Sequence, residues 1–275
     1  MLSACGLDAV GALAAEELPA TPAEGPEPAP ALDGERDAAV PDVPALCSDP
    51  ALAFDGVDDQ VTVPHDEALD LRDDFTVEAW VRPGPGAAMG AEMVIASHHD
   101  KDASRGWVLR FKGGRVELIV LGNEALIDSD YVAGDHGPAY VVANQWAHVA
   151  GTRKGDELRV YYGGVLRDTQ ALGFFFSRDH YSGPLRIGRG AAKATDYFQG
   201  EIDELRLSRI VRYTGETAPR PAGPFAVDEA TVSLFRFDEA QGTTAALDET
   251  GAHPGELGAG AEAPARVPVD CIPGR

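Results

Sequence analysis

The chain has 275 residues, enough for one large domain or two small ones with a buried core. Its 23 Lys and Arg residues against 45 Asp and Glu residues give a formal net charge of −22. This charge argues against a nucleic-acid interface and a polybasic membrane surface, because both need clustered positive charge. No apolar run approaches the roughly 18 residues that a membrane-spanning helix requires. The 31 Gly and 20 Pro residues favour a turn-rich globular protein.

Residues 1–46 have the composition of a disordered acidic stalk. From Gly6 to Leu46 the chain is mostly Ala, Pro, Glu and Asp, with Arg36 as the only basic residue and no aromatic residue. Such a segment buries too little apolar surface to offset the entropy of ordering it. Its prolines and like charges keep it extended. We therefore expect an Ala/Pro/Glu-rich linker over residues 1–46 and one folded domain over residues 47–275.

Two cysteines lie at the ends of the expected domain. Cys47 follows the stalk and Cys271 lies four residues before the end of the sequence. A disulfide between them would tie together domain termini, which often lie close in space. In the chain-entropy model a bridge over so long a loop contributes at most about 5 kcal/mol, and it implies an oxidising compartment. Two unpaired buried thiols are the alternative.

The third cysteine has a different context. Leu2-Ser3-Ala4-Cys5-Gly6 resembles the bacterial lipobox, in which small residues precede a cysteine that is lipidated and becomes the new N-terminus. A flexible stalk after Cys5 agrees with this interpretation. A signal peptide, however, needs a basic region and an apolar core of about 7–15 residues, and only four residues precede Cys5. As written, the chain would stay in the cytoplasm. We therefore expect a precursor that begins upstream of Met1.

This interpretation predicts an extracytoplasmic protein. The protein would be secreted or be a lipoprotein at the outer membrane or cell surface, and the lipid anchor on Cys5 would be its only contact with a membrane.

From Ala51 onward the pattern predicts β-strands. Residues 75–81 alternate strictly, with apolar side chains on one face and Thr76, Glu78 and Trp80 on the other. Gly113-Gly114 and Gly163-Gly164 each separate two β-rich runs, which is a strong hairpin signal. No segment of useful length shows a helical period. Further strand candidates are residues 60–63, 93–96, 146–153, 184–187, 200–207 and 231–237. The pattern predicts an all-β fold, an antiparallel two-sheet β-sandwich.

The order of these blocks resembles the laminin-G-like, concanavalin A-like jelly rolls. The resemblance rests on Ala51–Val61, Phe75–Pro83, Gln145–Thr152, Leu158–Gly164, Pro184–Gly188, Phe198–Leu207 and Leu234–Gly242. It implies a jelly roll. It does not imply an activity, because this fold hosts lectins, adhesion modules, pentraxin-like proteins, glycosidases and lyases.

The resemblance allows a test for catalysis. Retaining glucanases of this fold carry a Glu-x-Asp-x-Glu strand whose outer carboxylates serve as nucleophile and acid/base. Here the strand runs from Glu201 through Asp203 to Leu205, so an apolar residue stands where the second outer carboxylate is needed. Glu204 is expected on the opposite face. We therefore expect no catalytic residues.

Family members often carry calcium near an edge of the sandwich. The turn Asp55–Asp59 places three carboxylates around a glycine, and hard cations take such oxygens. Asp58, Asp59 and Asp203 are the expected ligands of one structural calcium. Alternatively, Asp55 and Asp58 cap the turn through its backbone, and Asp203 accepts hydrogen bonds from a neighbouring strand.

The histidines are weaker candidates for metal ligands than the Asp55–Asp59 turn. His98-His99-Asp100 has the residue types of a transition-metal site, but zinc needs three or four ligands and no partner pair is visible. We expect these residues in a solvated loop. His148 is expected to be a hydrogen-bonded structural residue, and Trp80 and Trp146 are expected in the core.

A glycan would stack on exposed aromatic rings beside polar groups. The loop aromatics chosen as candidates are Tyr131, Tyr140, Phe175, Tyr181 and Tyr197. Phe175 belongs to the run Phe174–Phe176, which cannot place every ring on one face of a strand. A buried loop cluster is the alternative.

Taken together, the sequence predicts a non-catalytic binding or adhesion module at the cell surface. Its expected partner is a polysaccharide or a surface glycoprotein. Two other functions stay open: a polysaccharide-active enzyme, either a glycoside hydrolase or a lyase, and a structural envelope protein without a small ligand.

Overall fold

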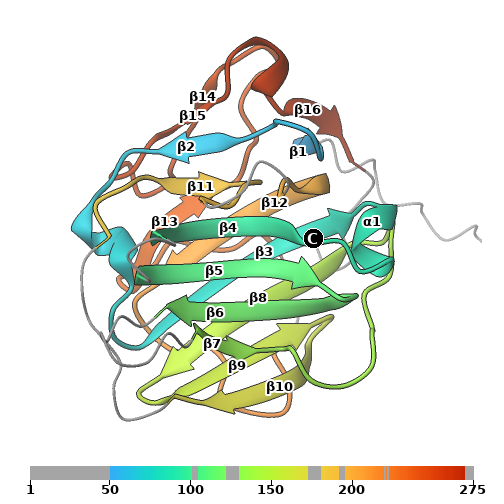
Figure 1. Ribbon diagram of the computed structural model, residues 1–275. Coiled ribbons are helices and arrows are strands. Elements are labelled where there is room, and N and C mark those ends of the chain that lie inside the picture. The colour runs from blue at the N-terminus through green and yellow to red at the C-terminus, as the bar shows by residue number, and fades with distance from the viewer. Residues whose placement is uncertain are drawn as a thin grey trace, which may run out of the picture. The chain divides into compact units, whose positions relative to one another are not determined.

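The structure is a computed structural model of the chain (Figure 1). It describes residues 50–100, 105–121, 130–172, 181–191, 196–219, 221 and 223–269. The predicted linker, Cys5, Cys47, Cys271 and Phe175 lie outside these residues. Within the described part of the chain, no helix is long and apolar enough to cross a membrane.

The described residues form two antiparallel sheets, which confirms the predicted β-sandwich. The first sheet has the order β10-β9-β8-β3-β12-β1-β16, and β13 also pairs with β12. Its strands are β1 (Pro50–Asp55), β3 (Phe75–Pro83), β8 (Ala147–Lys154), β9 (Glu157–Tyr162), β10 (Val165–Ala171), β12 (Gln199–Ser208), β13 (Thr231–Phe235) and β16 (Ala265–Pro268).

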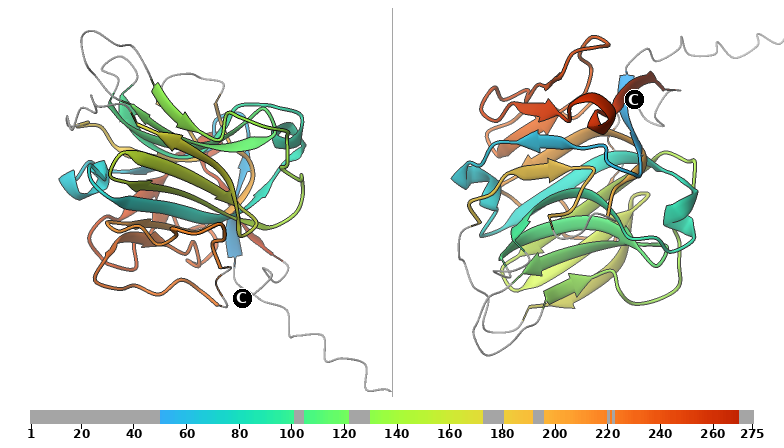
Figure 2. Two further views of the ribbon diagram at one scale, coloured as in Figure 1. Left: turned by 90° about the horizontal axis from the view of Figure 1, so that it is seen from below. Right: turned by 45° about the horizontal axis from the view of Figure 1, so that its top comes forward.

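The second sheet has the order β14-β15-β2-β11-β4-β5-β6-β7. Its strands are β2 (Val61–Val63), β4 (Met93–Asp100), β5 (Arg105–Lys112), β6 (Arg115–Leu121), β7 (Asp130–Ala133), β11 (Leu185–Ile187), β14 (Ala245–Ala246) and β15 (Gly255–Leu257). The short helices are η1 (Glu67–Asp70), α1 (Pro85–Ala88) and η2 (Gly260–Glu262). In Figure 2 the two sheets lie as separate layers, most clearly in the left view.

Both predicted glycine hairpins are present. Gly113 and Gly114 join β5 to β6 with φ of 59° and 72°, and Gly163 and Gly164 join β9 to β10 with φ of 63° and 84°. Positive φ at both central positions matches the twist of the flanking strands, and glycine adopts it without steric cost.

The core lies between the two layers. Phe75, Val77, Ala79 and Val81 are fully buried in one large apolar cluster with residues from both sheets, as their alternation predicts. Trp80 points to the other face of β3 and packs in a smaller cluster with Phe225, Leu234 and Trp146.

A β-bulge in β12 changes one prediction. The register of β12 against β3 shifts between Asp203 and Arg206, and Glu204 has a φ of 49°. The extra residue places Leu205 in the main core with Ile202, so the expectation that Leu205 shares a face with Glu201 and Asp203 is wrong.

The carboxylates of this strand are engaged within the fold. Glu201 accepts hydrogen bonds of 2.6 and 2.7 Å from Arg82, and Glu204 pairs with Arg236 at 2.7 Å. Asp203 accepts a hydrogen bond of 2.8 Å from the backbone of Glu204. Glu201 therefore joins β12 to β3, whereas the Asp203 hydrogen bond lies within the bulge itself.

A buried ionic network lies beside Trp80. Glu78 Oε1 accepts hydrogen bonds of 2.9 and 2.7 Å from Arg206. Glu78 Oε2 accepts one of 2.6 Å from the Tyr213 hydroxyl and lies 2.9 Å from His148 Nε2. The side chains of Glu78 and His148 are both fully buried. His148 is thus a hydrogen-bonded structural residue, as expected.

The partners of Glu78 keep it ionised. Burial by itself raises its pKa, but the hydrogen bond with His148 and the charges of His148 and Arg206 outweigh burial, so the pKa lies below its usual 4.5. Because its folded-state pKa is depressed, Glu78 stabilises the fold above about pH 4.5, and this contribution is lost as the pH falls.

We predict that Glu78→Gln destabilises the protein by about 3–5 kcal/mol at pH 7, because Arg206 then stays buried without its counter-charge. The measurement is the urea unfolding midpoint. The matched control is Glu201→Gln, whose pair with Arg82 is partly exposed, and it should cost about 1 kcal/mol or less. Below pH 4.5 the difference in unfolding free energy between wild type and Glu78→Gln should become smaller, because the wild-type Glu78 then loses its charge. Equal costs for the two variants would contradict the prediction.

Candidate functional site

The candidate site begins at the end of strand β4. His98 and His99 lie in this strand and are buried, so the expectation of a solvated loop is wrong. The strand continues because His98 pairs with Trp107 and His99 pairs with Gly106 of β5. Gly106 has a φ of 100°, and a Cβ at this position would lie 1.9 Å from the His98 carbonyl oxygen. Glycine at position 106 therefore allows β5 to approach β4 closely beside His98.

The helix η1 supplies the acidic residue of the site. Asp66 caps η1 by accepting a hydrogen bond of 2.8 Å from the Ala68 backbone. Leu69 is fully buried in the main core, and its carbonyl accepts a hydrogen bond of 3.1 Å from the Trp107 indole. These contacts place Asp70 beside His98.

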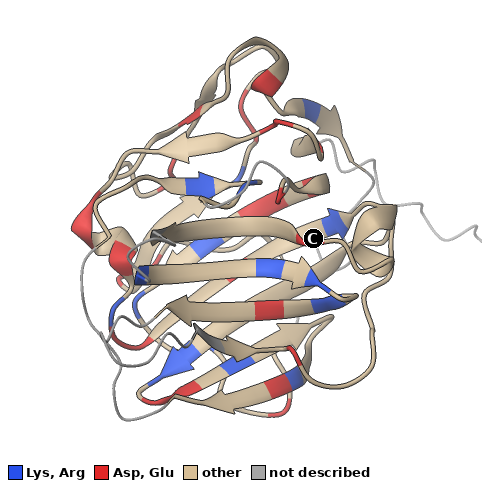
Figure 3. Ribbon diagram, viewed as in Figure 1, with Lys and Arg blue, Asp and Glu red and all other residues tan. Residues whose placement is uncertain are grey.

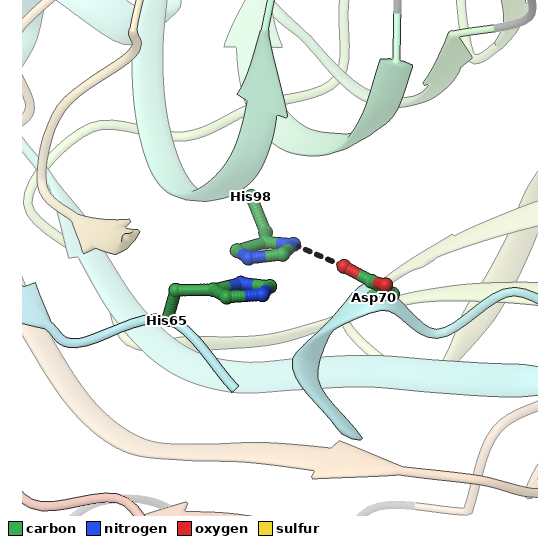
Figure 4. Close-up of side chains that lie close together, drawn as sticks. All are labelled: His65, Asp70 and His98. Carbon is green, nitrogen blue, oxygen red and sulfur yellow. Dashed lines mark ion pairs between the residues drawn. The ribbon is translucent and has the colours of Figure 1, made fainter. Parts of the chain in front are cut away.

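His65, Asp70 and His98 form a compact group (Figure 4). Asp70 Oδ1 lies 3.6 Å from His98 Nδ1, and both side chains are almost completely buried. The exposed ring of His65 lies parallel to that of His98, with 5.7 Å between the centroids. Tyr181 presents its ring at a steep angle to His98, with 4.9 Å between the centroids. We call these four residues the histidine cluster.

His98 is held in its neutral form. Burial lowers its pKa to about 4, so its ring carries no charge near neutral pH. Its Nε2 lies 3.0 Å from the carbonyl oxygen of Gly183. Because a carbonyl can only accept a hydrogen bond, the ring proton resides on Nε2, and Nδ1 carries a lone pair that faces Asp70.

The sequence did not single out His65 or Asp70. They come from the segment between β2 and β3, whereas His98 comes from β4. Asp66 followed by the helix-forming residues of η1 is a capping signal that predicts this turn. It does not predict that the turn docks against β4 and β5.

Among the predicted aromatic residues whose side chains the structure describes, Tyr140, Tyr181 and Tyr197 do not form one platform. Tyr131 lies in strand β7 rather than in a loop. Tyr140 is half-buried: its hydroxyl bonds to the Val116 backbone, Arg167 lies over its ring, and burial raises the pKa of Tyr140 to about 12.

The two remaining described candidates lie apart from Tyr140. Tyr181 belongs to the histidine cluster, and its hydroxyl accepts a hydrogen bond of 3.1 Å from Arg186. Tyr197 lies under Arg189, with 5.2 Å between the guanidinium and the ring centroid. No ring contact among the described residues joins any two of Tyr140, Tyr181 and Tyr197.

The predicted calcium ligands divide between two places. Asp58 and Asp59 form a group with Asp55 in which the carboxylate oxygens lie within 4.8 Å of one another. Asp55 Oδ1 accepts hydrogen bonds from the backbones of Val57 and Asp58, and Asp59 Oδ2 accepts one of 2.7 Å from the backbone of Asp55. Asp203 is not part of this group and pairs across the sheet with Trp80.

A polar hollow adjoins η1. It has a volume of about 470 Å³ and is lined mainly by charged residues, among them Arg72, Asp73, Asp74 and Arg209. Arg72 also donates a hydrogen bond of 3.0 Å to Asp70 Oδ2, so the hollow and the histidine cluster share this turn. Along the ribbon in Figure 3, acidic and basic positions are interspersed over the described strands of both sheets.

The sequence pattern of the concanavalin A-like lectin/glucanases superfamily matches residues 55–216, more than half of the chain. No curated protein matches the chain in sequence. Among solved structures, a protein from Bacteroides ovatus assigned to carbohydrate binding is 17% identical with a TM-score of 0.54. This similarity covers 81% of the present chain and 60% of the other, so the chain spans less than two thirds of that protein.

Two other solved structures are more distant. Domains LG4-5 of the mouse laminin alpha1 chain are 14% identical with a TM-score of 0.45, and the similarity covers 62% of this chain and 45% of that one. The CBM40 of a Ruminococcus gnavus IT-sialidase is 16% identical with a TM-score of 0.41, covering 53% of this chain and 79% of that one. At these identities, the structural similarities concern the fold alone.

We predict that Gly106→Ala lowers the thermal unfolding midpoint more than Gly137→Ala does. Both glycines have positive φ, but a Cβ at Gly137 would meet nothing within 4 Å, whereas one at Gly106 would clash with β4. The clash should cost about 1–3 kcal/mol beyond the shared backbone strain. That cost corresponds to roughly 2–12 °C for a domain of this size. Equal midpoints would show that β5 does not lie against His98 as described.

Proposed function

Because the chain belongs to the concanavalin A-like lectin/glucanases superfamily, we propose that it is a non-catalytic module that binds a polysaccharide or a surface glycoprotein. The match over residues 55–216 is the observation that carries this proposal. The fold shared with the Bacteroides ovatus protein, itself assigned to carbohydrate binding, supports it. A fold alone does not fix a function, so the proposal depends on a surface suited to a sugar.

We assign the glycan to the surface around η1. This surface, which we call the η1 surface, consists of His65, Arg72, Asp74, Tyr181 and Arg209. Tyr181 offers a half-buried ring against His98, and Arg72 and Asp74 line the hollow next to η1. A sugar ring has an apolar face that can stack on an aromatic ring and hydroxyl groups that can bind charged and polar side chains. Tyr140 is a weaker candidate, because Arg167 lies over its ring and its hydroxyl is bonded to the backbone.

The absence of catalysis is supported by the strand that carries catalytic carboxylates in related glucanases. Glu204 is fully buried in its pair with Arg236, and Glu201 is paired with Arg82. Carboxylates held this way are poorly placed to act on a bound sugar, because a nucleophile and an acid/base must reach the glycosidic bond from a shared cleft.

The proposed location is extracytoplasmic, at the cell surface or secreted. The proposal rests on Cys5 as a lipidation site and on a Cys47–Cys271 disulfide, which requires an oxidising compartment. The three cysteines lie outside the described residues. A surface location would also place the η1 surface where polysaccharides and glycoproteins are available.

A structural calcium ion at the Asp55–Asp59 turn remains part of the proposal. The group of Asp55, Asp58 and Asp59 offers several carboxylate oxygens, which suit a hard cation. Asp203 would not belong to this site, because it lies outside the group.

The glycan proposal predicts that the full chain binds at least one sugar on a glycan array. Tyr181→Ala should weaken that binding about tenfold or more, because stacking and the polar groups around it are lost together. The matched control is Tyr197→Ala, which removes a predicted aromatic outside the η1 surface. A blank array with and without calcium would favour a structural envelope protein. New reducing or unsaturated ends on a polysaccharide panel would favour a glycoside hydrolase or a lyase.

The calcium proposal predicts that millimolar Ca²⁺ raises the unfolding midpoint by a few degrees and that a chelator reverses the shift. An ion bound only to the folded state must stabilise it, by about 1–3 kcal/mol at 10 to 100 times the dissociation constant. Asp58→Asn should abolish the shift. An unfolding midpoint that does not change with calcium would contradict the proposed calcium site.

A further inference from the structure

We propose that His65, Asp70 and His98 form a binding site for a divalent transition-metal ion of the Zn²⁺ class. The potential ligand atoms of the three residues lie within 4.8 Å of one another. The site shares His65 with the η1 surface, but it does not rest on glycan binding, because its test is a direct titration with Zn²⁺. It shares no residue with the proposed calcium site.

The distance between His98 and Asp70 fits a shared ion better than a hydrogen bond. His98 Nδ1 lies 3.6 Å from Asp70 Oδ1, beyond the range of about 2.7–3.2 Å for a protein hydrogen bond to nitrogen. Two ligands that each lie about 2.1 Å from a tetrahedral zinc ion are about 3.4 Å apart. The pair is therefore spaced almost as two ligands of one ion require.

The hydrogen bonding of His98 leaves its Nδ1 available to a metal. Nε2 donates to the Gly183 carbonyl oxygen at 3.0 Å, as metal-binding histidines commonly do with their second nitrogen. Nδ1 then carries a lone pair, and it makes no hydrogen bond within the described residues, although the side chain is fully buried. Burying the Nδ1 lone pair opposite a carboxylate oxygen destabilises the fold unless a cation lies between the two atoms.

Asp70 is oriented for the same role. Its Oδ2 accepts a hydrogen bond of 3.0 Å from Arg72, and η1 is fixed by the burial of Leu69 and by the Trp107 hydrogen bond. The other oxygen, Oδ1, is therefore directed at His98. Such supporting contacts typically change metal affinity about 10–100-fold when they are lost.

His65 supplies the third ligand. Its ring is exposed and lies parallel to that of His98, so it directs a nitrogen at the shared ion after turning about its side-chain bonds. Two imidazoles and one carboxylate suit zinc and similar ions, whereas calcium prefers oxygen ligands throughout. Because the His65 side chain is exposed, a water molecule would complete the four ligands of the ion.

A second histidine group provides a contrast. In the group of Asp135, His136 and Asp168, the exposed His136 Nδ1 lies only 2.6 Å from Asp135 Oδ1, which is a hydrogen-bond distance. Asp168 Oδ2 already accepts a hydrogen bond of 2.8 Å from the Gly134 backbone. The polar atoms of this group already pair with one another and with the backbone, so we expect no metal ion there. His136 therefore serves as a matched control for His65.

The test is a calorimetric titration of the full chain with ZnCl₂ after removal of bound metal by a chelator. We expect one equivalent of Zn²⁺ to bind to the histidine cluster. Affinity should fall at least tenfold in His65→Ala and in Asp70→Asn, and it should be unchanged in His136→Ala. Because His65 is exposed, His65→Ala is expected to fold even if Asp70→Asn does not.

The variants separate this site from zinc held by thiols. His65→Ala leaves all three cysteines in place, so zinc bound to cysteine would persist in that variant. The proposal is overturned if wild-type protein binds no Zn²⁺, if His65→Ala binds it as tightly as wild type, or if His136→Ala weakens binding equally.

Discussion

Leu69 and Leu71 enter the hydrophobic core between the two sheets, and their burial holds η1 against strands β4 and β5. The indole of Trp107 adds a hydrogen bond to the Leu69 carbonyl, so the turn is fixed by both apolar packing and polar contact. Removing a buried leucine side chain typically costs about 2–5 kcal/mol, which shows how strongly such packing constrains a short helix. The position of Asp70, the hollow lined by Arg72 and the spacing between Asp70 and His98 all depend on this docking.

Most of the sandwich is predictable from local sequence patterns. Strict alternation over residues 75–81 and paired glycines between β-rich runs each reflect one strand or one turn, and both are found where expected. The bulge at Glu204 was not predictable, because it depends on how β12 meets β1, β3 and β13 along its length. It reverses the face expected for Leu205, since one inserted residue exchanges the two sides of a strand.

The candidate site was less predictable, for a physical reason. The sequence predicts a solvated loop for His98 because it shows no partner ligands for a metal, yet pairing with β5 buries His98, and Gly106 permits that pairing. His65 and Asp70 lie on the segment between β2 and β3, His98 lies on β4, and only the docking of η1 brings them together. Among the predicted aromatic residues whose side chains the structure describes, Tyr181 is the one whose ring contacts His98. Local patterns predict elements, whereas the site arises from contacts between elements.

The central claim is that the docking of η1 builds a site in which His98 and Asp70 face one ion. Anomalous scattering at the zinc absorption edge, from crystals of the full chain grown with Zn²⁺, tests this claim most directly. The account predicts an anomalous peak about 2.0–2.2 Å from both His98 Nδ1 and Asp70 Oδ1, with the His65 ring turned toward it. Anomalous peaks found only beside other residues, or none at all, would contradict the account.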